Sequence, residues 1–193
     1  MLSGVAEAGS IDLKKILIVG DSISASYGIN PKSGWVNLLA NKITQEKIPY
    51  QVINASISGD TTINGVNRLP ALINKHKPDI VIIELGGNDG LRGIQINVIQ
   101  NNLERMIKTS HINGAKILLA GMKIPPNYGR RYTQSFHQIY LNLADKYSIS
   151  LVPFMLEGVG GQASLMQADG IHPTAKAQPL IVETVWKYLS LML

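Results

Sequence analysis

Short apolar runs alternate with longer amphipathic segments along almost the whole chain. Five of the runs are rich in Ile, Val and Leu and have the length of buried strands: residues 15–19, 51–54, 80–84, 115–120 and 149–153. The third run contains Ile80-Val81-Ile82-Ile83, and so many β-branched residues favour a central strand that is buried on both faces.

The segments between these runs carry apolar residues three or four positions apart, which is the spacing of one helical face. Three such faces are Trp35, Leu38, Leu39 and Ile43; Leu69, Leu72, Ile73 and His76; and Ile99, Leu103, Met106 and Ile107. Two more helices are predicted, one over residues 132–147 and one from Pro173 through Leu189. Strands that alternate with helices predict an α/β protein, a three-layer α/β/α sandwich around a five-stranded parallel sheet.

No internal repeat or linker divides the sequence. We therefore predict one domain over residues 15–193, preceded by an N-terminal extension over residues 1–14.

Small polar residues follow three of the predicted strands. Gly20-Asp21-Ser22 follows the first, residues 56–60 follow the second and residues 86–90 follow the third. The carboxyl ends of parallel strands meet at one crevice, which places Ser22 where a nucleophile would lie. The N–H groups of Ser22 and Gly59 and the side chain of Asn88 could then form an oxyanion hole. Each loop alone is more simply explained as a glycine-rich turn, and Ser22 alone as a helix cap.

Asp169 and His172 are three residues apart in a predicted turn. This spacing lets the carboxylate reach Nδ1 of the imidazole, orient the ring and support the imidazolium that forms when the ring takes a proton from a serine. A capping Asp beside an incidental His is the alternative.

Composition narrows the classes of function. The chain has 193 residues, 45% of them hydrophobic and 16% charged, which is typical of a folded domain. Its net charge is +5 without any run of more than two basic residues, which argues against nucleic acid and is compatible with anionic substrates or lipid headgroups. Cysteine is absent, and we find no metal-ligand spacing, dinucleotide fingerprint or P-loop, so no cofactor and no metal are predicted. No stretch approaches about 18 apolar residues, so no membrane insertion is expected.

Four short motifs together resemble the four sequence blocks of the SGNH (GDSL-type) hydrolases: Gly20-Asp21-Ser22, Gly59, Asn88 and Asp169-x-x-His172. Longer stretches are similar to one branch of that family, bacterial multifunctional thioesterases that also act as proteases, lysophospholipases and arylesterases: residues 54–61, 68–72, 84–93, 127–132 and 169–173. The resemblance extends from Ile16 to the C-terminal helix.

This resemblance implies a flavodoxin-like fold with Ser22 as nucleophile, His172 as base and Asp169 as its orienting acid, and an oxyanion hole formed by Ser22, Gly59 and Asn88. It also implies a mobile substrate loop over residues 86–93, a monomer without cofactor, and a periplasmic location. Asp21 is then not the acid of the triad, and we expect it to brace the turn. We expect the substrate to contact Gly86, Gly87, Asp89, Leu91, Tyr128 and Ile171.

The predicted function is hydrolysis of carboxylic esters and thioesters, such as acyl-CoA, lysophospholipids and short-chain or aryl esters. Four segments at the rim, residues 23–29, 91–94, 124–128 and 154–165, are rich in apolar side chains and favour an acyl chain, unless they only pack the top of the sheet. The alternatives are a carbohydrate acetylesterase and a non-catalytic, flavodoxin-like module that binds an acyl group or anion. Residues 1–10 lack the regions of a signal peptide, although Ala6-Glu7-Ala8 is similar to the end of one; a simple extension is the other interpretation.

Overall fold

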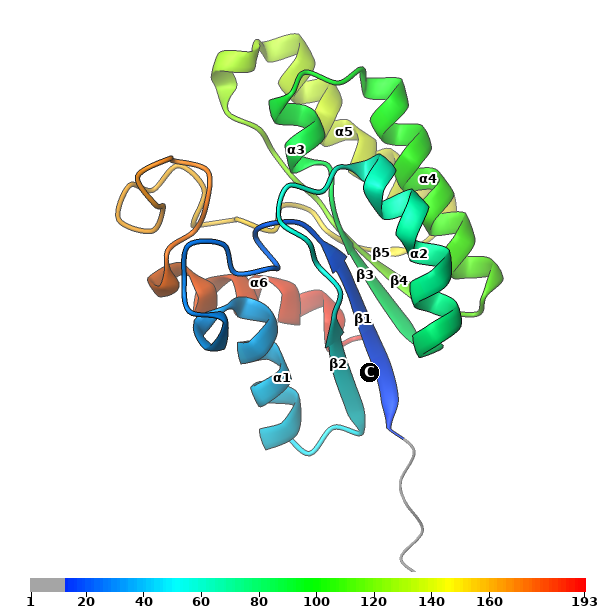
Figure 1. Ribbon diagram of the computed structural model, residues 1–193. Coiled ribbons are helices and arrows are strands. Elements are labelled where there is room, and N and C mark those ends of the chain that lie inside the picture. Colours follow the sequence, from blue (N-terminus) through cyan, green and yellow to red (C-terminus); the bar gives the residue numbers. More distant parts are fainter. Residues whose placement is uncertain (1–12) are drawn as a thin grey trace, which may run out of the picture.

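The computed structural model describes residues 13–193, and five parallel strands form its central sheet (Figure 1). Their order is β2-β1-β3-β4-β5, with bounds β1 Lys14–Gly20, β2 Tyr50–Asn54, β3 Ile80–Glu84, β4 Lys116–Ala120 and β5 Ser150–Val152. The α/β class and the five-stranded parallel sheet are therefore confirmed. Most of the predicted extension, with Ala6-Glu7-Ala8, lies outside the described residues, and Lys14 already belongs to β1.

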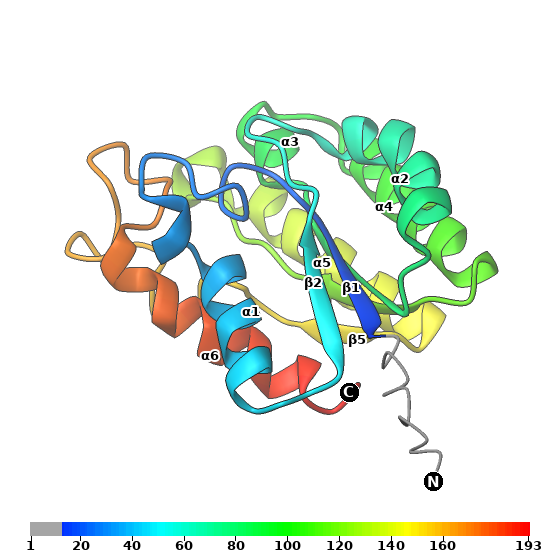
Figure 2. The same cartoon turned by 60° about the horizontal axis from the view of Figure 1, so that its bottom comes forward.

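Helices cover both faces of the sheet and complete the predicted three layers (Figures 1 and 2). On one face α1 (Trp35–Gln45) packs against α6 (Gln178–Leu189). On the other face α4 (Ile96–Ile112) packs between α2 (Thr62–His76) and α5 (Arg130–Tyr147).

The core lies between the sheet and these helices. All five residues of β3 are buried, as expected for the strand at the centre of the sheet. Trp35 of α1 and Phe136 and Tyr140 of α5 are the largest fully buried side chains. Burying a large apolar side chain stabilises a fold by about 1.5–3 kcal/mol, so these residues help to hold α1 and α5 in the folded domain.

The last helix begins later than predicted. Pro173 does not start a helix but pairs with Met166 in an antiparallel bridge. The backbone groups around Pro173 are used in that pairing: Gln167 N–H donates to the carbonyl of His172 at 2.7 Å, and Thr174 N–H donates to that of Leu165 at 2.8 Å. A short 3-10 turn, η3 (Ala175–Ala177), leads into α6, and Pro179 occupies the first turn of α6.

Two further short elements follow strands on the side of the sheet where the strands end. These are α3 (Gly87–Leu91), after β3, and the 3-10 helix η2 (Pro126–Tyr128), after β4. The helices within residues 13–193 include none with the length and apolar character needed to cross a membrane.

Candidate active site

Ser22, His172 and Asp169 form one continuous hydrogen-bonded chain, although Ser22 and His172 are 150 residues apart in sequence. The hydroxyl of Ser22 lies 2.9 Å from Nε2 of His172, and Nδ1 of the same ring lies 2.7 Å from Oδ2 of Asp169. Ser22 comes directly after β1, and the other two residues lie in the turn before η3. The structure thus brings together the three side chains that the sequence predicted as nucleophile, base and orienting acid.

The carboxylate of Asp169 is held by the chain that follows it. Oδ1 accepts the N–H groups of Ile171 at 2.9 Å and His172 at 3.0 Å. The pKa of Asp169 is lowered to about 2, mainly by the hydrogen bond from the His172 N–H and then by the bond from the His172 ring. The group is therefore a carboxylate at neutral pH and can orient the ring and support a positive charge on it.

Asp21 braces the turn at Ser22, as predicted. Its Oδ1 accepts the N–H of Ile23 at 3.1 Å, and its Oδ2 accepts the side-chain amide of Asn88 at 3.2 Å. Burial raises the pKa of Asp21 to about 6, against the hydrogen bonds and the nearby His172, which lower it. Asp21 therefore links the turn of the serine to the third predicted oxyanion donor.

Two of the predicted oxyanion donors, Ser22 and Gly59, lie in the loops after β1 and β2, and the third, Asn88, lies in α3. Nδ2 of Asn88 donates to the carbonyl of Asp60 at 2.9 Å, beside Gly59, as well as to Asp21, beside Ser22. The N–H groups of Ser22 and Gly59 donate to no backbone acceptor within the described part of the chain. Ser22 and Asn88 line the cavity beside the serine, whereas Gly59 is not part of its wall. The N–H groups of Ser22 and Gly59 are thus unused by the backbone, and Asn88 would have to release one of its two bonds to bind a ligand.

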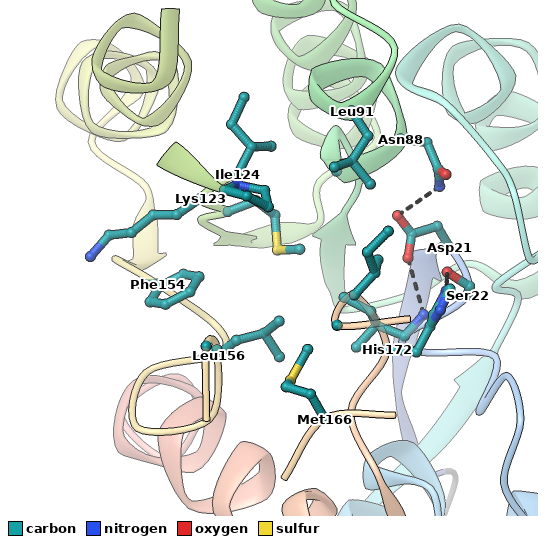
Figure 3. A pocket seen from close by; sticks show the side chains of 18 of the residues that line it. Asp21, Ser22, Asn88, Leu91, Lys123, Ile124, Phe154, Leu156, Met166 and His172 are labelled. Atoms are coloured by element: carbon teal, nitrogen blue, oxygen red, sulfur yellow. Dashed lines mark hydrogen bonds between the residues drawn. The ribbon is translucent and has the colours of Figure 1, made fainter. Parts of the chain in front are cut away.

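A cavity of about 470 Å³ opens beside Ser22 and His172 (Figure 3). Polar side chains, namely Asp21, Ser22, Asn88 and His172, lie on one side of it in this view. The opposite side carries the apolar side chains of Ile124, Phe154 and Leu156 (Figure 3), and the apolar lining also includes Met122, Pro125, Pro126 and Met166. A pocket of this size that has one polar edge suits an apolar chain with a reacting group at one end.

Comparison with known families agrees with this geometry. Residues 18–179 match the GDSL-like lipase/acylhydrolase family, a range that spans both Ser22 and His172. The chain belongs to that family.

Curated relatives of this GDSL-like acylhydrolase align over most of its length. It is 51% identical to the esterase TesA of Pseudomonas aeruginosa over 178 residues, covering 92% of this chain and 89% of that protein. It is 44% identical to thioesterase 1/protease 1/lysophospholipase L1 of Escherichia coli K12, covering 90% of this chain and 82% of that protein. The crystal structure of the esterase EstA from Pseudoalteromonas, inhibited by monoethylphosphonate, superposes with a TM-score of 0.89 at 40% identity over 93% of this chain and 98% of that one.

Three of the predicted substrate contacts of the acylhydrolase lie in the cavity wall and three do not. Gly87, Leu91 and Ile171 line the cavity, whereas Gly86, Asp89 and Tyr128 do not. Asp89 is only 2% exposed, and its carboxylate accepts the N–H of Thr62 at 2.9 Å and the hydroxyl of Thr62 at 2.6 Å, so it caps α2 instead of facing substrate. The hydroxyl of Tyr128 donates to the carbonyl of Leu91 at 3.0 Å, outside the cavity.

Gly86 has a backbone role. Its φ of +115° disfavours a side chain, and an added Cβ would lie 2.2 Å from the hydroxyl of Tyr140. The segment it starts was expected to be a mobile loop over residues 86–93, but residues 87–91 form the helix α3. Gly87, Asn88 and Leu91 therefore share the face of α3 that borders the cavity, while Asp89 is buried behind it.

Several residues of the site were missed from the sequence. Met122, Lys123 and Met166 line the cavity, and the first two follow the end of β4 in the same way that Ser22 follows β1. The amine of Lys123 points away from Ser22 and lies 4.6 Å from the centre of the Phe154 ring (Figure 3). That position after a strand was a usable signal for Met122 and Lys123.

Arg68 was also missed as a support of the site. From α2 its Nε bonds Asp60 at 2.7 Å, its Nη2 bonds the carbonyl of Gly20 at 3.1 Å, and its Nη1 bonds the carbonyl of Ala55. One guanidinium thus ties the turn before Ser22 to the loop of Gly59, a geometry that its five fixed donors make possible.

A further buried acid, Glu84, contacts the serine turn. Its Oε2 accepts the N–H of Asp21 at 3.2 Å and the hydroxyl of Ser24 at 2.6 Å, while Oε1 is buried without a hydrogen-bond partner. Complete burial, together with the charge of Asp21, raises the pKa of Glu84 well above its usual range. Burial thus favours the protonated form of Glu84, and its side chain fixes the backbone of Asp21. No group of three His, Cys, Asp or Glu side chains within residues 13–193 is placed to hold a metal ion.

Proposed function

We propose that this hydrolase cleaves carboxylic esters and thioesters through an acyl-enzyme formed on Ser22. The observation that carries the proposal is the unbroken chain from Asp169 through His172 to the Ser22 hydroxyl at the mouth of a largely apolar cavity. The inhibition of the related EstA by a phosphonate supports it, because phosphonates react with activated serines.

In the proposed acylation step, Nε2 of His172 takes the proton of Ser22 while Oγ attacks the acyl carbonyl. The resulting oxyanion accepts hydrogen bonds from the N–H groups of Ser22 and Gly59, and Asn88 joins them by exchanging one of its protein acceptors for the oxyanion. The imidazolium then gives its proton to the departing alcohol or thiol, which leaves an ester on Ser22. Asp169 stays ionised throughout and supports the imidazolium.

Deacylation repeats the same steps with water. His172 takes a proton from a water molecule that attacks the acyl carbon, the oxyanion hole again accepts the negative charge, and the proton returns to Oγ of Ser22 as the carboxylic acid leaves. No group beyond the residues named and water is needed for this cycle to balance.

The cavity favours substrates with an acyl chain. Its apolar wall includes Met122, Ile124, Phe154 and Leu156, and the last three lie across the cavity from the reacting serine (Figure 3). Each methylene buried there favours binding by about 0.8 kcal/mol, about fourfold in kcat/KM. We expect the names of the relatives, an esterase and a thioesterase/lysophospholipase, to describe the substrate range of this chain as well.

A chain-length series of p-nitrophenyl esters and acyl-CoA thioesters tests the proposal. We expect kcat/KM to rise from acetyl to octanoyl esters, and Ser22→Ala to abolish turnover while the variant stays folded. A Ser22→Ala protein with wild-type turnover would contradict the mechanism. Activity that falls steadily from acetyl to octanoyl would instead favour the carbohydrate acetylesterase.

Covalent labelling of the serine distinguishes an enzyme from a non-catalytic acyl-binding module. A fluorophosphonate probe should modify the wild-type protein at Ser22 and fail to label Ser22→Ala, because only an activated serine attacks phosphorus. A wild-type protein that binds fatty acid without being labelled would favour the binding module.

We also propose a single-domain monomer that works in the periplasm, on the family resemblance given above. Light scattering at micromolar concentration and fractionation of cells that express the natural gene would test the two statements. A dimer, or a protein recovered only with the cytoplasm, would contradict them.

A further inference from the structure

An aromatic ring covers one face of the base. The ring of Tyr27 lies against the imidazole of His172, with 4.5 Å between the ring centres and 41° between their planes. Tyr27 is 53% exposed, whereas the side chain of His172 is only 18% exposed. Tyr27 is thus a half-exposed residue outside the buried core, and its ring lies in contact with the base.

The backbone of Tyr27 is held from both sides. Its N–H donates to the carbonyl of Ser22 at 3.0 Å, and its carbonyl accepts Nε2 of Gln167 at 2.8 Å. Gln167 also donates from Nε2 to the carbonyl of Pro173 at 3.1 Å and from its N–H to that of His172 at 2.7 Å. Tyr27 is thereby fixed to the loop of the nucleophile and to the loop of the base at once.

Gly28 makes this arrangement possible. Its φ is +72°, and an added Cβ would lie 2.2 Å from Oε1 of Gln167. A side chain at position 28 would displace the amide that holds Tyr27 in place.

We propose that Tyr27 is a positioning residue that keeps the His172 ring turned so that Nε2 faces Ser22. This inference rests on the proposed function, in which His172 moves the proton. Asp169 holds the ring at Nδ1 only, and rotation away from Ser22 is blocked where Tyr27 packs on its face. The face of an aromatic ring also attracts the imidazolium that forms as Ser22 loses its proton.

The test compares Tyr27→Leu with Tyr27→Phe. The hydrogen bonds found in the described part of the chain use only the backbone of Tyr27, so the phenylalanine variant should keep wild-type rates. Tyr27→Leu should lower kcat by about 3- to 30-fold, the range expected for a lost contact between a ring and a cation. KM should change less than about twofold, because Tyr27 is not part of the cavity wall.

The second readout is the leaving group. An alkoxide needs the proton that His172 delivers, whereas p-nitrophenolate departs without one. We therefore expect Tyr27→Leu to reduce kcat/KM for ethyl octanoate more than for p-nitrophenyl octanoate. A residue that only supports the fold would reduce both equally. Tyr188→Leu, near the C-terminal end of α6, serves as the matched control and should leave the ratio unchanged.

The outcomes separate the two proposals. A wild-type protein that hydrolyses neither ester overturns the proposed function. An active wild type whose Tyr27→Leu variant keeps both kcat and the ratio of the two esters overturns the role of Tyr27. Equal losses on both esters, or a phenylalanine variant as impaired as the leucine variant, also overturn it.

Discussion

The side-chain amide of Asn88 is bound to the carboxylate of Asp21 at 3.2 Å, which links the predicted oxyanion donor to the residue that precedes the nucleophile. The other amide hydrogen is bound to the carbonyl of Asp60 at 2.9 Å. An oxyanion must therefore replace one of these acceptors. The bond to Asp21 is the longer of the two, so in the proposed mechanism the bond to Asp60 holds the amide in place while the one to Asp21 is exchanged.

Removing this amide should reduce catalysis and leave binding nearly intact. We expect Asn88→Ala to lower kcat by about 100- to 1,000-fold, the usual effect of losing one oxyanion donor, with KM within about threefold of wild type. Steady-state kinetics on a p-nitrophenyl ester and a thermal melt measure both effects. A variant that keeps more than a tenth of the wild-type kcat would show that Asn88 does not contact the oxyanion.

The buried carboxyl of Asp21 should impose a pH dependence on stability. Burial raises its pKa from 3.8 to about 6, so between these values the folded protein binds a proton that the unfolded chain has lost. Its contribution is therefore fully present below pH 4 and is lost as the pH rises through 6. This difference in pKa corresponds to about 3 kcal/mol.

Asp21→Asn removes this titration. Between pH 4 and pH 7 the urea midpoint of the wild type should fall relative to that of the variant. The expected result is this change in the difference between the two midpoints, whatever the difference is at pH 4. Parallel curves for the two proteins over that range would mean that Asp21 is not raised by burial. Asp145→Asn, at an exposed position of α5, controls for the loss of a surface carboxylate.

Asp169 has the opposite shift, and its replacement tests its role in orienting His172. Because the pKa of Asp169 is about 2, the group is charged at every pH at which an esterase would be assayed. Asp169→Asn should lower kcat by about 1,000- to 10,000-fold, since an amide cannot hold the same tautomer or support the imidazolium. An Asn variant within tenfold of the wild type at pH 7 would exclude this role.

The sequence predicted the residues of this site best where polar residues come directly after a predicted strand or lie close together in sequence. Gly20-Asp21-Ser22 and Asn88 could be placed at strand ends by periodicity alone, and the spacing of Asp169 and His172 indicated a base with its acid. Ser22 and His172 lie 2.9 Å apart because of the way β1 and the turn before η3 pack together. Local sequence patterns do not give this packing, and only the family resemblance indicated that the two residues form a pair.

Errors arose where the direction of a side chain decides its role. Asp89 follows Asn88 in sequence, but successive residues of a helix point about 100° apart, so Asp89 faces Thr62 and Asn88 faces the cavity. Pro173 is a residue type that often begins a helix, but here it pairs with Met166 in a β-bridge. This pairing gives hydrogen-bond partners to the backbone groups of the residues on both sides of Pro173, His172 and Thr174. Arg68 and Tyr27 contact partners distant in sequence, and no local pattern reveals such contacts.

Arg68 offers a test of how the loops of the site are held together. Its guanidinium and its partner Asp60 are only 18% and 10% exposed, so removing the arginine takes the donor from a poorly hydrated carboxylate and from the carbonyl of Ala55. The carbonyl of Gly20 would keep only the N–H of Ile57, at 3.1 Å. We expect Arg68→Met to lower the free energy of unfolding by about 3 kcal/mol. It should also lower kcat, because the loops of Gly20 and Gly59 lose their common anchor.

The double variant Arg68→Met/Asp60→Asn distinguishes the charge from the anchor. Neutralising Asp60 should restore part of the stability, since the unpaired buried carboxylate is gone, but not kcat, since the loops stay untied. Arg105→Met, at an exposed position of α4, is the matched control and should change the free energy of unfolding by less than about 0.5 kcal/mol. Full recovery of kcat in the double variant would mean that Arg68 acts only by neutralising Asp60, and the anchoring of the two loops would have to be assigned to other contacts.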